Sequence, residues 1–268
     1  MNRKVLIYIA LFILIIDCAL FTYKIYQKEK HHPKPIHKVK NHAKYSVYLT
    51  SDDGPLKGSK NLNEIIETYE VPMSLFLVGK PLSSDEDLEP NFISYKNNSY
   101  ALLGNHSFSH ANSRYKRYYK NPENVENDFI KNKEFLELNS KVARLPGRNV
   151  WVVGDRTKGE PNALKAAKLL AKDYNYSFYG WDYELRHKGN KVTLDAKSHY
   201  KKIKELLKNQ KTFTKNHIVI LMHDQMFTNP TSQKVLGELI LLLQDDEEIK
   251  LKKIDKYPLT SIASTTKN

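Results

Sequence analysis

The chain contains almost no cysteine. Cys18 is the only one among 268 residues, so no intramolecular disulfide can form, and it lies in an apolar run rather than in a metal-binding cysteine spacing. No internal repeat or low-complexity segment interrupts the sequence after residue 44. A chain of this length can bury a large core, which excludes a disulfide-stapled miniprotein. We expect one large globular domain over residues 45–268.

Acidic residues are fewer than basic ones. The chain has 43 Lys and Arg against 30 Asp and Glu, a net charge of +13. The excess is uneven, because the first 44 residues hold nine Lys or Arg and only two acids. With 40% hydrophobic and 11% aromatic residues overall, the remainder is too apolar to be a disordered polycation. The charge predicts a partner that is anionic or lies near an anionic surface.

Three short segments precede the domain. Residues 1–4 are a basic head, residues 5–23 an apolar run broken only by Asp17 and Cys18, and residues 24–44 a linker rich in Lys, His and Pro. The 19-residue run is long enough for about one bilayer crossing as a helix, and no small-residue cleavage site follows it. We therefore expect a single-pass, uncleaved signal anchor in the cytoplasmic (inner) membrane. A lipid on Cys18 is a poor alternative, because Asp17 stands where a small residue is required.

The charges around this anchor leave its orientation open. Arg3 and Lys4 precede it, whereas seven Lys and one Glu follow it, which alone would place the domain in the cytosol. We favour a domain on the periplasmic or extracellular side. The four linker histidines indicate a basic segment near anionic lipid head groups rather than a metal-binding tract; they are His31, His32, His37 and His42.

After residue 44, short apolar runs alternate with helical patterns, which is typical of a largely parallel sheet with crossover helices. Helix starts are predicted at Asn61, Asn121 and Ser198. The predicted strands are 46–50, 73–78, 100–104, 142–145, 177–181, 217–222 and 249–254. Seven such units fit a barrel or a doubly wound sheet, and periodicity does not separate the two. In both folds, polar residues at the carboxyl ends of the strands gather in one crevice.

Ionisable residues lie at or just after the ends of five of these strands. They are Asp52 with Asp53, His106 with His110, Arg144, Asp182, and His223 with Asp224. Two imidazoles four residues apart can face one cation, and a carboxylate from another strand end can complete the ligand set. Each cluster alone is explained by a capped turn or a surface ion pair. Five of them at strand exits indicate a site.

The ordered motifs resemble those of the polysaccharide deacetylases of the NodB-homology type, carbohydrate esterase family 4. The motifs are Thr-x-Asp-Asp-Gly-Pro from Thr50, His-Ser-x-Ser-His from His106, Arg-x-Pro from Arg144, Trp-Asp from Trp181 and Leu-x-His-Asp from Leu221. They cover residues 45–254, nearly the whole domain. The resemblance implies an α/β fold, a distorted (β/α)7 barrel with the site at the carboxyl ends of its strands.

The resemblance also implies one divalent metal ion. It makes Asp53, His106 and His110 the ligands, which suits Zn²⁺ first and Co²⁺, Ni²⁺ or Fe²⁺ as alternatives. Three protein ligands leave open positions for water and for a substrate carbonyl oxygen.

Four residues are implied in proton transfer. Asp52 would be the catalytic base, with Arg144 pairing with it and holding its orientation. His223 would be the catalytic acid that protonates the departing amine, with Asp182 orienting it.

Three further residues are expected to bind substrate, although their surroundings depart from the usual family pattern. Gly147 follows Pro146 where an aromatic residue is common, and its backbone N–H could assist the oxyanion. Trp181 could stack on a sugar ring. Met222 stands where a leucine often lines the acetyl pocket.

Together these features imply a membrane-anchored, metal-dependent deacetylase that removes the N-acetyl group from an amino sugar of a cell-envelope polysaccharide and releases acetate. A deacetylase of a lipid-linked sugar precursor and a non-catalytic glycan-binding barrel are the alternatives. We expect no nucleic-acid partner. Residues 114–120 interleave basic and aromatic side chains as single-strand binders do, but a solvated loop beside the cleft is the better interpretation.

Overall fold

The computed structural model describes residues 14, 16–17, 40 and 42–260. Contacts divide the chain into residues 1–36 and 37–268. The predicted anchor, residues 5–23, lies outside the described residues except for Leu14, Ile16 and Asp17, which are helical. Within the part of the chain that is described, no helix has both the length and the apolar character needed to cross a bilayer.

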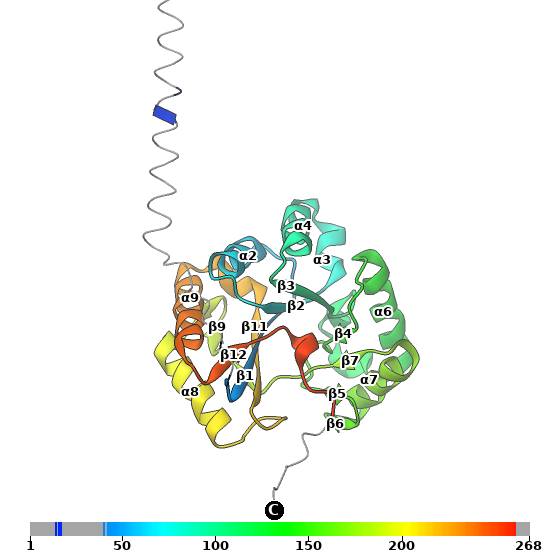
Figure 1. The fold of residues 1–268 in the computed structure, drawn as a ribbon. Helices are drawn as coiled ribbons and strands as arrows, with labels where there is room; N and C mark the ends of the chain where they lie inside the picture. Colours follow the sequence, from blue (N-terminus) through cyan, green and yellow to red (C-terminus); the bar gives the residue numbers. More distant parts are fainter. Residues whose placement is uncertain (1–13, 15, 18–39, 41, 261–268) are drawn as a thin grey trace, which may run out of the picture. The chain divides into compact units, whose positions relative to one another are not determined.

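A sheet of ten strands forms the centre of the domain (Figure 1). Its strands are β1 (Tyr45–Asp52), β2 (Met73–Leu77), β3 (Ala101–Asn105), β4 (Val142–Ala143), β5 (Trp151–Val153), β6 (Arg156–Lys158), β7 (Ser177–Phe178), β8 (Tyr183–Glu184), β11 (His217–His223) and β12 (Ile249–Leu251). Two more strands, β9 (His187–Lys188) and β10 (Lys191–Val192), form a separate antiparallel hairpin. All seven predicted strands are present, so the expected α/β fold is confirmed.

The sheet is curled and mixed rather than a closed parallel barrel. Its order is β6-β5-β7-β4-β3-β2-β1-β11-β8, and β12 pairs with the first residues of β1. From β7 to β8 the neighbours are parallel, but β5 runs antiparallel to both β6 and β7. Among the described residues, no pairing joins β6 to β8. The curled sheet is consistent with the expected distorted barrel, but it stays open as a half-barrel, because a hairpin ends one edge and a two-residue strand ends the other.

Eight α-helices and four short 3₁₀ turns are described between the strands (Figure 1). The helices are α2 (Ser59–Thr68), α3 (Gly79–Ser84), α4 (Glu89–Asn97), α5 (Tyr115–Tyr118), α6 (Pro122–Phe135), α7 (Pro161–Tyr174), α8 (Ala196–Lys208) and α9 (Pro230–Asp245). The 3₁₀ turns are η1 (Glu86–Leu88), η2 (His110–Ser113), η3 (Asp224–Thr228) and η4 (Ile254–Lys256).

Capping explains one predicted helix start and corrects two. The Asn121 side chain accepts the backbone N–H of Glu123 at the start of α6, as expected. The start at Ser198 is wrong, because Asp195 caps α8 by accepting the Ser198 N–H at 2.7 Å. The start at Asn61 is wrong as well, because α2 begins at Ser59.

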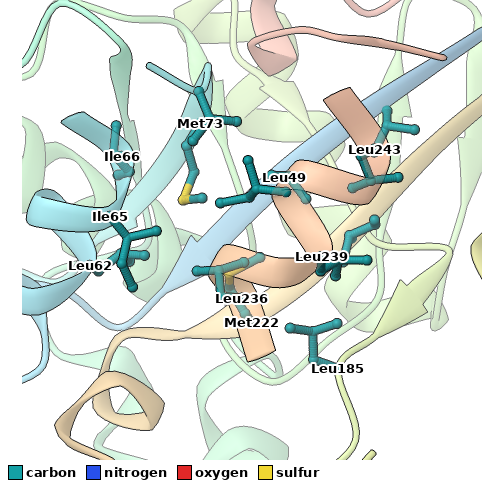
Figure 2. Packing of buried hydrophobic residues seen from close by; sticks show 14 of the residues in the cluster. Leu49, Leu62, Ile65, Ile66, Met73, Leu185, Met222, Leu236, Leu239 and Leu243 are labelled. Carbon is teal, nitrogen blue, oxygen red and sulfur yellow. The ribbon is translucent and has the colours of Figure 1, made fainter. Parts of the chain in front are cut away.

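Strand alternation separates two apolar faces of the sheet. Every second residue of a strand packs under α2, α8 and α9; examples are Val47, Leu49 and Met222. Figure 2 shows this packing, with leucines of α9 beside Leu49 and Met222. Residues of the other parity, such as Tyr48, face inward into a smaller cluster. Asp52 and His223 have the inward parity, so both carboxyl ends deliver polar groups to the inside of the curl.

Candidate active site

Adjacent aspartates end the first strand in different environments. Asp52 closes β1 and is only 3% exposed. Asp53 follows in a turn with φ of 73°, in the left-handed region that few non-glycine residues adopt. The change of backbone direction places two carboxylates side by side at the strand exit, each with one oxygen 3.6 Å from His106 Nε2.

A buried arginine holds the Asp52 carboxylate. Arg144, which is fully buried, donates from Nη1 to Asp52 Oδ1 at 2.7 Å and to Thr50 Oγ1 at 2.8 Å. Its other nitrogens donate to the backbone carbonyls of Tyr179 and Gly180, each at 2.9 Å. The pairing expected between Arg144 and Asp52 is present, and four hydrogen bonds fix its geometry.

The same contact keeps Asp52 ionised. Burial alone would raise the pKa of the Asp52 carboxyl, but the charge of Arg144 is the largest effect in the opposite direction, and the pKa lies below its usual range. A carboxylate without a proton at neutral pH can accept one from water.

Asp53, His106 and His110 converge as the motifs predict. Asp53 Oδ1 lies 3.2 Å from His110 Nε2 and 3.6 Å from His106 Nε2. One ligand atom from each residue lies within 4.8 Å of the other two. The three side chains come from two strand exits, those of β1 and β3, which lie on either side of β2.

The environment of these atoms fits a divalent cation. His106 Nδ1 lies 2.8 Å from the Arg144 carbonyl oxygen, which can only accept, so Nδ1 carries the proton and Nε2 offers a lone pair. Asp53 Oδ1 is buried and has no hydrogen-bond partner among the described residues. A cation at the centre of the three residues would satisfy these lone pairs.

The pKa shifts of His106 and Asp53 agree with a cation at this position. Burial lowers the pKa of His106 to about 3, so the ring is neutral at physiological pH. Burial, together with the charges of Asp52 and Asp224, raises the pKa of Asp53 to about 7, because a negative charge is costly there. A cation would remove that cost.

A strained loop presents the two histidines. Ser107 and the four residues from His110 to Ser113 have φ between 46° and 65°. Asp128 of α6 holds the loop, accepting the backbone N–H of Ser109 at 3.1 Å and its hydroxyl at 2.9 Å. Tyr118 donates to the same carboxylate at 2.9 Å. Such strain persists only where surrounding contacts enforce it, and it is characteristic of functional sites.

His223 reaches the site, but Asp182 does not orient it. The Asp182 carboxylate accepts the backbone N–H groups of Phe213 at 2.6 Å and Val219 at 2.8 Å, and both lie before His223, the last residue of β11. The carboxylate beside His223 is Glu184, whose Oε1 lies 4.0 Å from His223 Nδ1. The expected pairing is wrong, because β8 aligns Glu184 with Leu221 near the strand exit and leaves Asp182 below it.

The three residues expected to bind substrate lie in different surroundings. Met222 is fully buried in the cluster under the helices, so its assignment to an acetyl pocket is wrong; it has the opposite strand parity to His223. Trp181 is half-buried, with its ring 6.0 Å from the Arg144 guanidinium carbon. Gly147 is exposed and has φ of 60°, and a Cβ there would lie 2.8 Å from the Tyr115 ring.

Residues 114–120 do not form the solvated loop expected from the sequence. Tyr115–Tyr118 is the short helix α5, and Tyr119 is buried. The Tyr115 ring packs edge-on against His110, with centroids 5.8 Å apart. Arg114, Lys116, Arg117 and Arg148 line a cavity of about 410 Å³ around Tyr115. The aromatic residues therefore face the core and the histidine loop, and the basic ones line the hollow around Tyr115.

Three contributors escaped the sequence analysis: Glu184, Tyr115 and Asp128. Glu184 lies two residues after the motif that drew attention to Asp182, so strand alternation offered a signal for it. Tyr115 stood inside the basic and aromatic stretch. Asp128 lies in a helix with no motif, and nothing in the sequence singles it out.

Comparison with known proteins agrees with the motifs. Residues 39–148 match the family described as polysaccharide deacetylase. A peptidoglycan-N-acetylglucosamine deacetylase of Bacillus cereus is 25% identical over 180 residues, which cover 66% of this chain and 59% of that protein. The match thus spans about three fifths of the relative's length.

Solved structures share the fold. The catalytic domain of a peptidoglycan N-acetylglucosamine deacetylase from Eubacterium rectale superimposes with a TM-score of 0.58 at 15% identity, covering 81% of this chain and 92% of that one. A CE4 esterase of Streptococcus mutans gives 0.56 at 20% identity, covering 79% and 87%. The matched segment and the shared fold confirm the resemblance of this chain to the polysaccharide deacetylases of the NodB-homology type.

Proposed function

We propose that the chain is a metal-dependent deacetylase that hydrolyses the N-acetyl group of an amino sugar and releases acetate. The observation that carries the proposal is the convergence of Asp53, His106 and His110 beside a second, ionised carboxylate, that of Asp52. Both similarity to a named deacetylase and the order of the motifs support it.

The metal supplies one part of the chemistry. When bound by Asp53, His106 and His110, a divalent ion acts as a Lewis acid that polarises the acetamide carbonyl and lowers the pKa of water from about 15.7 towards about 7. The donor set of one carboxylate and two imidazoles suits Zn²⁺, with Co²⁺, Ni²⁺ and Fe²⁺ as further candidates.

The chain's own residues move the protons. Asp52 accepts the proton of the attacking water, and Arg144 keeps its carboxylate in place and ionised. His223 faces Asp52 across the β1–β11 register and donates a proton to the departing amine. We propose that Gly147 and Trp181 border the substrate; the exposure of Gly147 and the half-buried state of Trp181 support this.

We further propose a glycan of the cell envelope as the substrate and residues 5–23 as a membrane anchor that holds the domain on the periplasmic or extracellular side. The apolar run supports the anchor, and the name of the Bacillus cereus relative supports the glycan. Protease accessibility of the domain in intact cells, compared with lysed cells, tests the orientation. Protection in intact cells would contradict an external domain.

The basic rim around Tyr115 keeps a lipid-linked, phosphate-bearing sugar precursor as the second candidate substrate. Comparing acetate release from peptidoglycan fragments with release from the same sugar on a diphosphate carrier separates the two substrates. Faster turnover of the carrier form would favour the precursor.

Acetate release by the purified full-length protein tests the reaction itself. We expect that Asp52→Asn and prolonged chelation each abolish release, and that added Zn²⁺ restores it only in the chelated wild type. Asp173→Asn, an exposed aspartate of α7, is the matched control. A metal-stripped protein that keeps its full rate would refute metal dependence, and tight glycan binding without acetate release from any N-acetylated glycan would favour a non-catalytic barrel.

A further inference from the structure

A second cluster of ligand atoms lies at the end of β11. Glu184, His187 and His223 each offer one atom, and these atoms lie within 4.8 Å of one another. Glu184 Oε1 lies 3.6 Å from His187 Nε2 and 4.0 Å from His223 Nδ1. The two imidazole centroids are 5.7 Å apart. None of these three residues belongs to the Asp53 cluster.

The protonation of His187 leaves a lone pair aimed at this cluster. His187 Nδ1 lies 2.9 Å from the carbonyl oxygen of Gly189, which can only accept a hydrogen bond. Nδ1 therefore carries the proton, and Nε2, the atom nearest Glu184, is an acceptor. The arrangement repeats that of His106, whose Nδ1 donates to the Arg144 carbonyl.

His223 offers its ring nitrogen Nδ1 to this cluster. Its Nδ1 is buried and has no hydrogen-bond partner among the described residues, although the ring as a whole is 24% exposed. The Glu184 carboxylate at 4.0 Å is too far for a hydrogen bond. A cation between Nδ1 and the carboxylate would satisfy both.

The spacing suits a small divalent ion after a minor adjustment. Bonds of about 2.0–2.1 Å in a tetrahedral site separate the ligand atoms by roughly 3.3 Å. The observed 3.6 and 4.0 Å exceed this by less than one ångström. Glu184 is 40% exposed and His187 27%, so rotation of these side chains can close the difference.

We propose that Glu184, His187 and His223 form a second divalent-cation site, and that occupation of this site inhibits the enzyme. The inhibitory part rests on the proposed function, in which His223 is the acid. With its Nδ1 held by a cation, the ring could give up its Nε2 proton only by becoming an imidazolate anion. Proton donation to the leaving amine would therefore stop.

Zinc stoichiometry tests the site without reference to activity. Full-length wild type, His187→Ala, Glu184→Gln and the control Lys188→Ala, an exposed neighbour on the same hairpin, are equilibrated with Zn²⁺ and analysed for bound metal. We expect His187→Ala to bind one zinc fewer than wild type and Glu184→Gln to bind the second zinc at least about tenfold more weakly. Differences between variants cancel any zinc on the linker histidines. Equal stoichiometry and affinity in all four proteins would overturn the site.

Inhibition supplies the second readout. Above one equivalent, Zn²⁺ should slow acetate release by wild type and Lys188→Ala, and the inhibitory concentration should rise at least about tenfold in His187→Ala relative to that variant's own maximal rate. Identical inhibition of His187→Ala and wild type would overturn the inhibitory role. Loss of one zinc in His187→Ala, with no acetate release from any protein, would instead sink the proposed function and leave the second site standing.

Discussion

Arg144 shows how much of the site depends on one buried side chain. Its guanidinium compensates the Asp52 carboxylate and also binds two backbone carbonyls next to the sheet. Removing one partner of such a buried pair leaves an uncompensated charge in a medium of low polarity. Arg144 therefore fixes both the position and the negative charge of Asp52, the proposed base.

We expect Arg144→Met to lower the free energy of unfolding by about 3–5 kcal/mol, because Asp52 stays buried without its counter-charge. Urea denaturation of the purified variant measures this. The double variant with Asp52→Asn should recover part of the loss. Arg186→Met, at an exposed position, is the control and should change stability by less than about 0.5 kcal/mol. A double variant no more stable than Arg144→Met would contradict the pairing.

Asp182 has a stability role instead of the expected catalytic one. Burial raises the pKa of its carboxyl from 3.8 to about 6, although the N–H groups of Val219 and Phe213 oppose the shift. Because the folded pKa is the higher one, the contribution of this group to stability is full below about pH 4 and is lost as the pH rises through about 6.

Asp182→Asn should remove that pH dependence. In unfolding measurements from pH 4 to 7, the midpoint of the wild type should fall relative to that of the variant as the pH rises, because only the wild type loses the contribution of this group. Parallel pH profiles would show that Asp182 does not titrate in this window.

At the scale of elements, the histidine loop depends on helix α6. The left-handed residues after His106 cannot hold their conformation alone, and Asp128 ties the loop to α6 through Ser109 and Tyr118. The helix itself starts sharply at Asn121 and Pro122. A change in α6 should therefore be felt at the metal ligands.

Asp128→Asn should weaken metal binding about 10- to 100-fold, the usual cost of losing a group that orients ligands. Competition with a chromophoric chelator measures the affinity, and circular dichroism checks that the fold is retained. Glu134→Gln, exposed on the same helix, should bind metal like the wild type. Unchanged affinity in Asp128→Asn would mean that the loop holds its shape without the carboxylate.

Elements were more predictable than the contacts between them. Apolar runs located all seven predicted strands, and the Asn-Pro pair located α6. The β5–β6 hairpin was missed, because Trp151–Val153 and Arg156–Lys158 have only three residues each, too few for a periodicity to show. The roles predicted for Asp182 and Met222 were wrong for another reason. Which residue reaches the crevice depends on where the strand ends and on its register with the neighbouring strand, and a short motif carries no information about these two features.

For the whole molecule, charge distribution predicts how the substrate arrives. The net charge is +13, and four basic side chains rim the cavity beside His110. Fields of this kind raise the association rate of anionic partners and weaken within a Debye length of about 8 Å at physiological ionic strength.

Turnover of an anionic N-acetylated glycan should fall with salt through kcat/KM, by roughly tenfold between low and physiological ionic strength. The double variant Arg114→Gln, Arg117→Gln should flatten this dependence, whereas Lys165→Gln on α7 should not. A neutral N-acetylated oligosaccharide is the substrate control. An equal salt effect on both substrates would show that the rim does not attract anionic glycans.

β1 pairs with one strand that is close to it in sequence and with another that is distant, and we expect the two pairings to form at different times. Its neighbour β2 follows within about thirty residues, whereas Thr50 reaches Ile220 across a sequence separation of 170 residues. Short-range pairing forms before long-range pairing, because closing a longer loop is entropically costlier. A chain emerging from the ribosome can thus assemble the proposed metal ligands well before the proposed proton donor, His223, has been made. Newly made molecules would then be able to bind the metal ion but would remain inactive until the last third of the chain has folded onto the sheet.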